Sequence, residues 1–139
     1  MLGFASAGGT RLGNVVHYVV VSRFLHPTTF GEFNGATSPR VKEIMQIFSR
    51  AGFPTAATSN MDAWQKTHAA WISPIANALY MVNCDNHVLA RSLNVLRLAV
   101  HAIRESFRVL RALGIPITSG KLRMWERVPE SISVRLLMQ

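Results

Sequence analysis

Apolar residues recur alternately four and three positions apart over residues 89–110, and this pattern constrains the fold more than any other feature of the chain. The stripe consists of Leu89, Leu93, Leu96, Val100, Ile103, Phe107 and Leu110, and it is widened by Val88, Val95, Ala99, Ala102 and Val109. This spacing places the side chains on one broad face of an α-helix, which needs several neighbouring elements to bury it. We expect a single helix over residues 85–113, about 40 Å long, which Gly114 and Pro116 end.

Further helices are predicted before this stripe. Ser38 and Pro39 are typical of a helix start, because the serine side chain accepts from a first-turn amide and proline needs no partner there. Apolar residues at helical spacing follow as far as Phe48. A central helix is expected over residues 60–72, and Pro74 should break or kink it before a second helical piece that reaches Met81.

Two more short helices are expected at the end of the chain, one capped by Ser119 and one over residues 130–139. The chain stops inside the apolar pattern of the last one, so we expect it to be a fragment of a longer protein. The predicted fold class is mainly α: one domain over residues 1–139, with strands in residues 1–35 and helices over 38–139.

The predicted strands lie around a β-branched run, Val15–Val21. Gly13-Asn14 before this run is typical of a turn. Residues 2–7 and Thr29–Gly31 are both able to pair with the run, which predicts a short N-terminal β-meander. The glycines in this region do not have the G-x-G-x-x-G spacing of a dinucleotide-binding turn, so we interpret them as turn residues.

Composition places the chain among ordered globular domains. Hydrophobic residues make up 49% and charged residues 16% of 139 residues, a balance that allows a sizeable core,. No apolar run approaches the roughly 18 residues of a membrane span, and the N-terminus does not resemble a signal peptide. The single cysteine, Cys84, excludes an internal disulfide and is expected to be buried,. Cytoplasmic residence is the default expectation.

The net charge of +8 admits nucleic acid or an anionic substrate as partner,. Several arginines follow the apolar stripe, at positions 91, 97, 104, 108 and 111, but no basic run is interleaved with aromatic residues. A solvated helix face explains this pattern better than a nucleic-acid interface. We therefore expect neither nucleic acid nor a membrane among the partners.

Lys66 is the candidate catalytic residue of the chain. It is the one lysine in a helical run whose only other charged residue is Asp62, and it is flanked by Trp64 and Trp71. A lysine among apolar neighbours loses hydration, which lowers its pKa toward the range useful for proton transfer. The alternative is that Lys66 extends to water from an amphipathic helix.

Ser73 and Asn77 follow Lys66 at helical spacing, seven and eleven residues later, and are candidate substrate-binding residues together with Asn86,. Their neutral hydrogen-bonding groups suit an anionic substrate. Alternatively, Ser73 and Asn77 satisfy backbone groups that Pro74 leaves free. His68 has no second ligand at metal-binding spacing, so no metal site is predicted.

Taken together, these segments resemble the C-terminal domain of ketopantoate reductase-like proteins over nearly the whole chain. GNVVHYVVV is similar to the strands that open that domain, and TFGEFNG to its short "iGe" segment. SPRVKEIMQIFSRAGFPT resembles the helix and connector that follow. NMDAWQKTHAAWISPIANALYM resembles the central motif, a tryptophan and a lysine two residues apart before a helix break. ALGIPIT resembles a joint before the later helices.

The resemblance implies an all-helical domain of the 6-phosphogluconate dehydrogenase C-terminal type, partnered by an N-terminal Rossmann domain that this chain lacks. It further implies that NADP binds the Rossmann domain and that a 2-keto acid lies in the cleft, with Lys66 as general acid. The isolated fragment is then expected to bind no cofactor and to be inactive.

Two departures from the family pattern bear on the substrate. Ala70 stands where the family often has asparagine, one turn after the lysine, so Ser73 or Asn77 would have to replace it. A family glutamate that helps to hold substrate would lie beyond the end of this chain. The alternative function is a non-catalytic helical interaction module that forms a homodimer.

Overall fold

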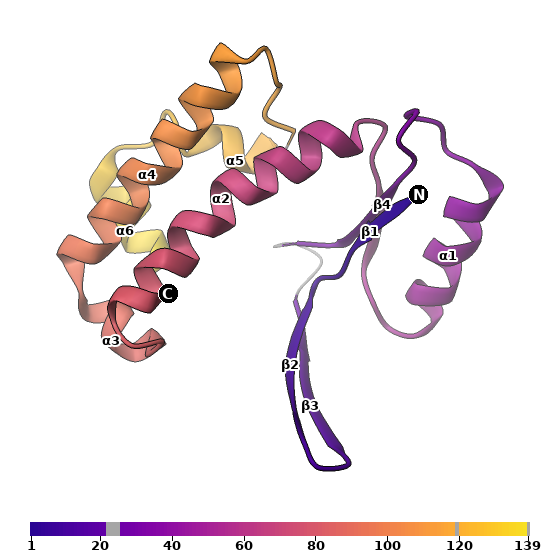
Figure 1. The fold of residues 1–139 in the computed structure, drawn as a ribbon, viewed down its shortest axis with the longest axis horizontal. Helices are drawn as coiled ribbons and strands as arrows, with labels where there is room; N and C mark the ends of the chain where they lie inside the picture. Colours follow the sequence, from indigo (N-terminus) through magenta and orange to yellow (C-terminus); the bar gives the residue numbers. More distant parts are fainter. Residues whose placement is uncertain (22–25, 119, 139) are drawn as a thin grey trace. The chain divides into compact units, whose positions relative to one another are not determined.

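The computed structural model describes residues 1–21, 26–118 and 120–138, which form two compact units, Met1–Asp62 and Ala63–Gln139 (Figure 1). The described residues are about 54% helical, which confirms the expectation of a mainly α chain with a small strand region. The predicted cap at Ser119 lies outside the described residues. No helix among the described residues has the length and apolar character that crossing a membrane requires.

The first unit contains a small mixed sheet in the order β1-β4-β5. Strand β1 (Leu2–Phe4) pairs antiparallel with β4 (Thr28–Gly31), and β4 pairs in parallel with β5 (Thr55–Ala57). Residues 55–57 form a strand although strands were predicted only in residues 1–35. The run is too short to show alternation, and its pairing with the fully buried β4 decides its conformation.

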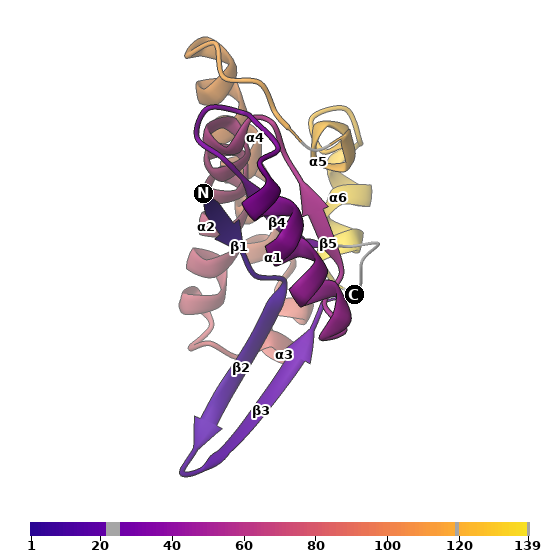
Figure 2. The ribbon, with the colours of Figure 1, turned by 90° about the vertical axis from the view of Figure 1, so that its right-hand side faces the viewer.

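A separate two-stranded hairpin is formed by β2 (Ala7–Leu12) and β3 (Val15–Val20). Gly13 has φ of +60°, a conformation suited to glycine, and confirms the predicted turn,. The expected meander is wrong, however, because residues 29–31 pair with β1 and not with the β-branched run. Both sheets are visible in Figure 2.

Helix α1 (Pro39–Arg50) begins as the sequence predicts. The Ser38 hydroxyl accepts a hydrogen bond from the Val41 amide at 3.2 Å, and Pro39 occupies the first turn. Phe48 on this helix contacts Phe30 of β4 edge-on, with ring centroids 5.2 Å apart. The helix is thereby held to the strand that it follows.

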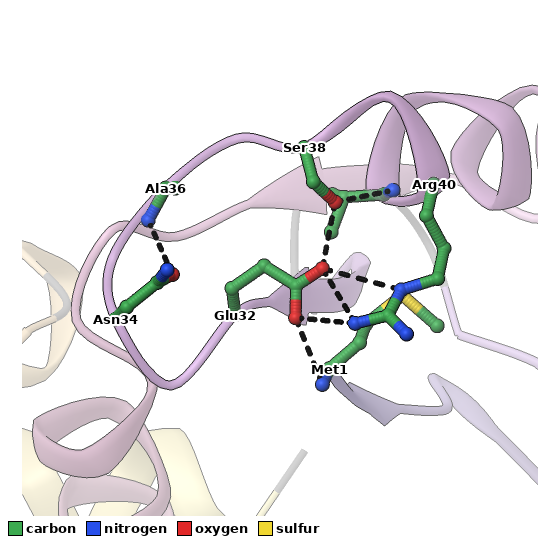
Figure 3. A network of polar contacts seen from close by, with 7 residues as sticks. Met1, Glu32, Asn34, Ala36, Ser38 and Arg40 are labelled. Carbon is green, nitrogen blue, oxygen red and sulfur yellow. Dashed lines mark hydrogen bonds and ion pairs between the residues drawn. The ribbon is translucent and has the colours of Figure 1, made fainter.

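Glu32 is a nearly buried carboxylate that ties the end of β4 to the start of α1 (Figure 3). One of its oxygens lies 2.8 Å from the Met1 amino group, and both lie 2.9 Å from Nη2 of Arg40. The Ser38 hydroxyl donates to it at 2.6 Å. Hydrogen bonds from the Met1 amino group, Ser38 and Arg40 lower the pKa of Glu32 from 4.5 to about 2.

Glu32→Gln is expected to destabilise the first unit at neutral pH, because a neutral amide accepts more weakly from an ammonium and a guanidinium. The folded pKa lies below the unfolded value, so the carboxylate's contribution is fully present above pH 4.5 and is lost as the pH falls from 4.5 toward about 2,. Urea unfolding at a series of pH values should show the difference between wild type and variant shrinking over this window.

The matched control is Glu43→Gln, which removes an exposed carboxylate from α1. It should unfold like wild type throughout. A stability difference for Glu32→Gln that stays constant down to pH 2 would contradict the assigned role of the Glu32 charge.

The second unit is helical, and the bounds of its helices differ from the predicted ones in two places. The helices are α2 (Met61–Met81, whose first two residues belong to the first unit), α3 (Asn86–Arg91), α4 (Leu93–Ala112), α5 (Gly120–Met124) and α6 (Glu130–Leu137). The predicted break at Pro74 is wrong, since α2 continues through it. Trp71 and Ile75, on either side of the proline, pack against the same apolar cluster and hold both halves of α2.

The single helix expected over residues 85–113 is also wrong, because Ser92 divides it. Ser92 has ψ of 75°, which is not helical, and its hydroxyl donates to the Val88 carbonyl at 2.8 Å. The end of the stretch follows the prediction, since Gly114 has φ of +72° just after the last residues of α4.

Cys84, expected to be buried, is exposed in a left-handed turn with φ of +61°.

The central residues of the apolar stripe form the core of the second unit. Leu96, Val100, Ile103 and Phe107 are each 2% exposed or less. The predicted band is not covered over its full width. Val88 and Val109 of its flanks are 47% and 57% exposed, and Leu93 of the stripe is 49% exposed, although Ala99 of the flanks is buried. The buried face is therefore narrower than the sequence indicates.

Arg104 on α4 binds the C-terminal segment through three acceptors. Its Nε donates to the Trp125 carbonyl at 3.2 Å, and its Nη2 donates to the Val128 carbonyl. A longer contact, 3.4 Å, joins Nη2 to the hydroxyl of the buried Ser133. One guanidinium thus satisfies polar groups of the turn before α6 and of α6 itself.

Arg104→Met should lower the free energy of unfolding of the second unit by about 2 kcal/mol or more, because bonds from a charged donor are lost and the carbonyls are left unpaired. Arg104→Lys should not restore it, since an ammonium lacks the planar fork. Urea denaturation measures both. Arg108→Met, on an exposed side chain 3.6 Å from Glu105, is the control and should change stability by less than about 0.5 kcal/mol,. Equal effects at the two positions would contradict the role of Arg104.

Candidate functional site

Helix α2 carries three of the four predicted site residues. Because α2 is continuous through Pro74, Lys66, Ser73 and Asn77 stay on one line along the helix,. Ser73 stands about 10 Å and Asn77 about 16 Å further along the axis than Lys66. The continuity of α2 therefore aligns residues that a break at the proline would have separated.

A groove of about 350 Å³ runs between α2 and α4. Ser73 and Asn77 both line it, so the structure brings these two predicted residues together. The remaining lining residues are Pro74, Ala78 and Met81 from α2, and Val95, Leu98, Ala99, Ala102 and Ser106 from α4. The groove is therefore mainly apolar with a few hydrogen-bonding groups, a composition typical of small-molecule sites.

Lys66 does not line this groove, and it is exposed. This exposure agrees with the alternative that Lys66 extends to water. The loss of hydration expected from its apolar sequence neighbours does not occur, because the helix directs those neighbours elsewhere. Trp64 stacks on His68 with ring centroids 5.2 Å apart, and Trp71 meets Trp125 edge-on at 4.3 Å. The aromatic residues thus pack with one another and with the C-terminal segment.

Asn86 is not brought to the groove. It is the exposed first residue of α3, and the preceding Asp85 caps that helix by accepting from the amides of His87 and Val88 at 2.8 and 3.0 Å. The hydrogen bonds from Val88 and His87 lower the pKa of Asp85. The structure gives this segment a helix-capping arrangement.

The position of α2 depends partly on Thr67, a residue that sequence reasoning passed over. Its buried hydroxyl accepts from the Thr118 amide at 3.3 Å and lies 3.5 Å from the Pro116 carbonyl. Ala70 packs against the cluster of Ile103 and Phe107. The position where the resembling family often has asparagine therefore faces apolar core in this chain.

Ser106 is a groove residue that the sequence did not reveal. Its hydroxyl donates to the Ala102 carbonyl one turn earlier, at 2.8 Å, and it retains lone pairs for another donor,. Only the packing of α4 against α2 places it in the groove that Ser73 also lines. Its sequence position on α4, one residue before a buried phenylalanine, carries no signal of this role.

A second hollow, about 420 Å³, is lined by His101, Arg104, Arg108 and Glu126. Most of the basic side chains in and around it lie close to an acidic side chain. His101 lies 3.0 Å from Glu130, and Arg111 donates to both carboxylate oxygens of Glu126 through its Nε and Nη2. The spacing of residues 101, 104 and 108 could have indicated this basic strip. Its charges are largely occupied by ion pairs.

Among the described residues, no three side chains of His, Cys, Asp or Glu gather as metal ligands would.

Comparison with known proteins does not identify the chain: no protein-family model matches it, and neither does any curated protein or solved structure.

Proposed function

We propose that this chain is the substrate-side helical domain of a ketopantoate reductase-like, NADP-dependent oxidoreductase that reduces a 2-keto acid in the cytoplasm. The observation that carries the proposal is the groove lined by Ser73 and Asn77, on the same line of α2 as Lys66. The fold would be of the 6-phosphogluconate dehydrogenase C-terminal type. A Rossmann domain outside this chain would bind the cofactor.

The groove offers what a small keto acid needs. The Ser73 hydroxyl and the Asn77 amide can donate to a carboxylate, and the alanine-rich wall of α4 can contact an aliphatic chain,. The exposed Lys66 stands about 10 Å along the helix from Ser73. An extended lysine side chain and a small substrate together can bridge that span, which would bring the ammonium to the keto oxygen.

Lys66 would serve as general acid. A cofactor held by the Rossmann domain would supply the hydride for the carbonyl carbon. The Lys66 ammonium would offset the negative charge that develops on the carbonyl oxygen and would give that oxygen a proton. The lysine would then regain a proton from water. If the Rossmann domain covered Lys66, the attraction between its ammonium and the carbonyl oxygen would be stronger, since charges attract more strongly away from solvent.

Ala70 argues for a substrate pocket that differs from the family pattern. Its side chain packs on the apolar cluster, so an asparagine there has no counterpart in the groove. Ser73 and Asn77 would take over its hydrogen bonds. We propose a 2-keto acid as the substrate class, with ketopantoate as one member to be tested.

A helical interaction module is the second candidate, and exposed apolar side chains on α4 favour it. Leu98, Val109 and Leu113, at and just beyond this helix, are 54%, 57% and 67% exposed. The same groove between α2 and α4 would then receive a helix of a second copy. Light scattering that shows a monomer at all concentrations would argue against this module.

Lys66→Gln and Asn77→Ala should each weaken binding of 2-ketopantoate or a related 2-keto acid to this chain by about tenfold or more, because each removes a bond to a charged group. Chemical-shift titration measures the affinity and shows whether the shifted resonances belong to groove residues. Lys42→Gln, which removes the charge of an exposed lysine on α1, is the matched control and should bind like wild type.

In a protein that unites this chain with a nucleotide-binding domain, Lys66→Ala should lower turnover about 100-fold or more, in line with the loss of a general acid. Binding of NADPH should remain. Undiminished turnover would reject the catalytic role of Lys66, and absence of keto-acid shifts in the groove would reject the site.

A further inference from the structure

The hairpin β2–β3 exposes an unusual amount of apolar surface. Its largest apolar side chains are between 57% and 70% exposed: Leu12, Val15, Val16, Tyr18 and Val19. A two-stranded hairpin alone is at best marginally stable in water. A further strand is therefore needed to cover this hairpin. The backbone hydrogen bonds indicate which edge of the hairpin that strand would join.

The outer edge of β3 follows from the hydrogen-bond pattern of the hairpin. The Val21 amide donates to the Ser6 carbonyl at 2.7 Å. Bonded residues alternate along an antiparallel strand, so the backbone groups of Val15, His17 and Val19 also face β2,. Those of Val16, Tyr18 and Val20 point away from β2. Within the described part of the chain, no third strand joins this sheet.

The β3 edge lacks the features that normally prevent strand addition. VVHYVV contains no proline, glycine, lysine or acidic residue,. The opposite edge, on β2, carries Gly8, Gly9 and Arg11, and its glycines weaken any added pairing,. Strand addition should therefore occur along β3.

We propose that β3 pairs antiparallel with β3 of a second copy of this chain, about a two-fold axis at Tyr18. Opposite residues in a sheet share a face, so the two-fold axis must pass through a residue. An axis at one of the two central residues of β3, His17 or Tyr18, keeps most of the strand paired. With the axis at Tyr18, Val16 faces Val20 of the second copy, and Tyr18 faces Tyr18. All three outward residues of each copy then form bonded pairs.

The alternative register, with the axis at His17, is poorer. It places two histidines opposite each other and sets Val20 against Asn14 in the turn of the second copy. The Tyr18 register has only Val–Val, Tyr–Tyr and His–Val neighbours, pairs that β-sheets favour. This self-complementarity is the reason for choosing a second copy as the occupant of the edge.

Charge sets the expected behaviour of the dimer. Each chain carries a net charge of +8, whereas the β3 edge carries no charge apart from any on His17. The copies repel over most of their surface and attract along one apolar edge. Salt should therefore strengthen association, since it screens the repulsion. A single added strand buries less than a standard interface, so the dimer should be weak and concentration-dependent.

Cysteine cross-linking tests the register directly. In a Cys84→Ser background, Tyr18→Cys places two cysteines in a bonded pair, with Cα atoms about 5.5 Å apart, within the range for a disulfide. Val19→Cys, one residue away, places them about 8 Å apart, beyond that range. Under mild oxidation, the Tyr18→Cys chain should form covalent dimers at least tenfold faster than the Val19→Cys chain.

Sedimentation of variants without cysteine supplies the second measurement. Tyr18→Pro removes an outward-facing amide without breaking a bond to β2, whereas Tyr18→Thr keeps that amide. The proline variant should be monomeric, and the threonine variant should still dimerise, because it keeps the amide and Thr–Thr pairs are also favourable in sheets. A monomeric wild type at all concentrations would overturn the proposal, as would equal cross-linking of the two cysteine variants or growth into larger aggregates.

Discussion

Burial of the Ile103 and Phe107 face of α4 is the constraint on which the second unit depends. Both side chains are fully buried, and each such burial contributes about 1.5–3 kcal/mol. The elements that cover them come from separate parts of the chain: Trp71 from α2, Ile117 from the segment after α4, and Trp125 after α5. Elements from several parts of the second unit thus pack on one face of α4. The same packing holds α2 in the orientation that places Ser73 and Asn77 in the groove.

Polar anchors complete this arrangement at places where the chain changes direction. Arg104 satisfies carbonyls of the turn before α6, and Thr67 receives the amide of Thr118. In the first unit Glu32 does the same for the start of α1, with Ser38 and Arg40 as donors. Arg104 and Thr67 thus pair with backbone groups, and Ser38 and Arg40 satisfy the buried Glu32 carboxylate, whose burial would otherwise be costly,.

The candidate site shows which part of a function can be inferred from spacing. Lys66, Ser73 and Asn77 were aligned by helical periodicity, and a groove does contain the last two. The exposure of Lys66 was only one of two alternatives, because the environment of a helical side chain depends on which neighbouring element covers its face. Ser106 was missed for the same reason: it belongs to the groove only because α4 packs against α2.

Sequence alone determined the features whose partners lie within a few residues. The Ser38 cap, the glycine turns at residues 13 and 114, and the buried centre of the α4 stripe all depend on local backbone geometry and helical period. Tertiary structure decided the rest: that α2 continues through Pro74, that residues 55–57 become a strand, and that the groove lies where it does. These outcomes depend on contacts between residues distant in the chain, whose energies outweigh the local preference of a proline or of a short run without pattern.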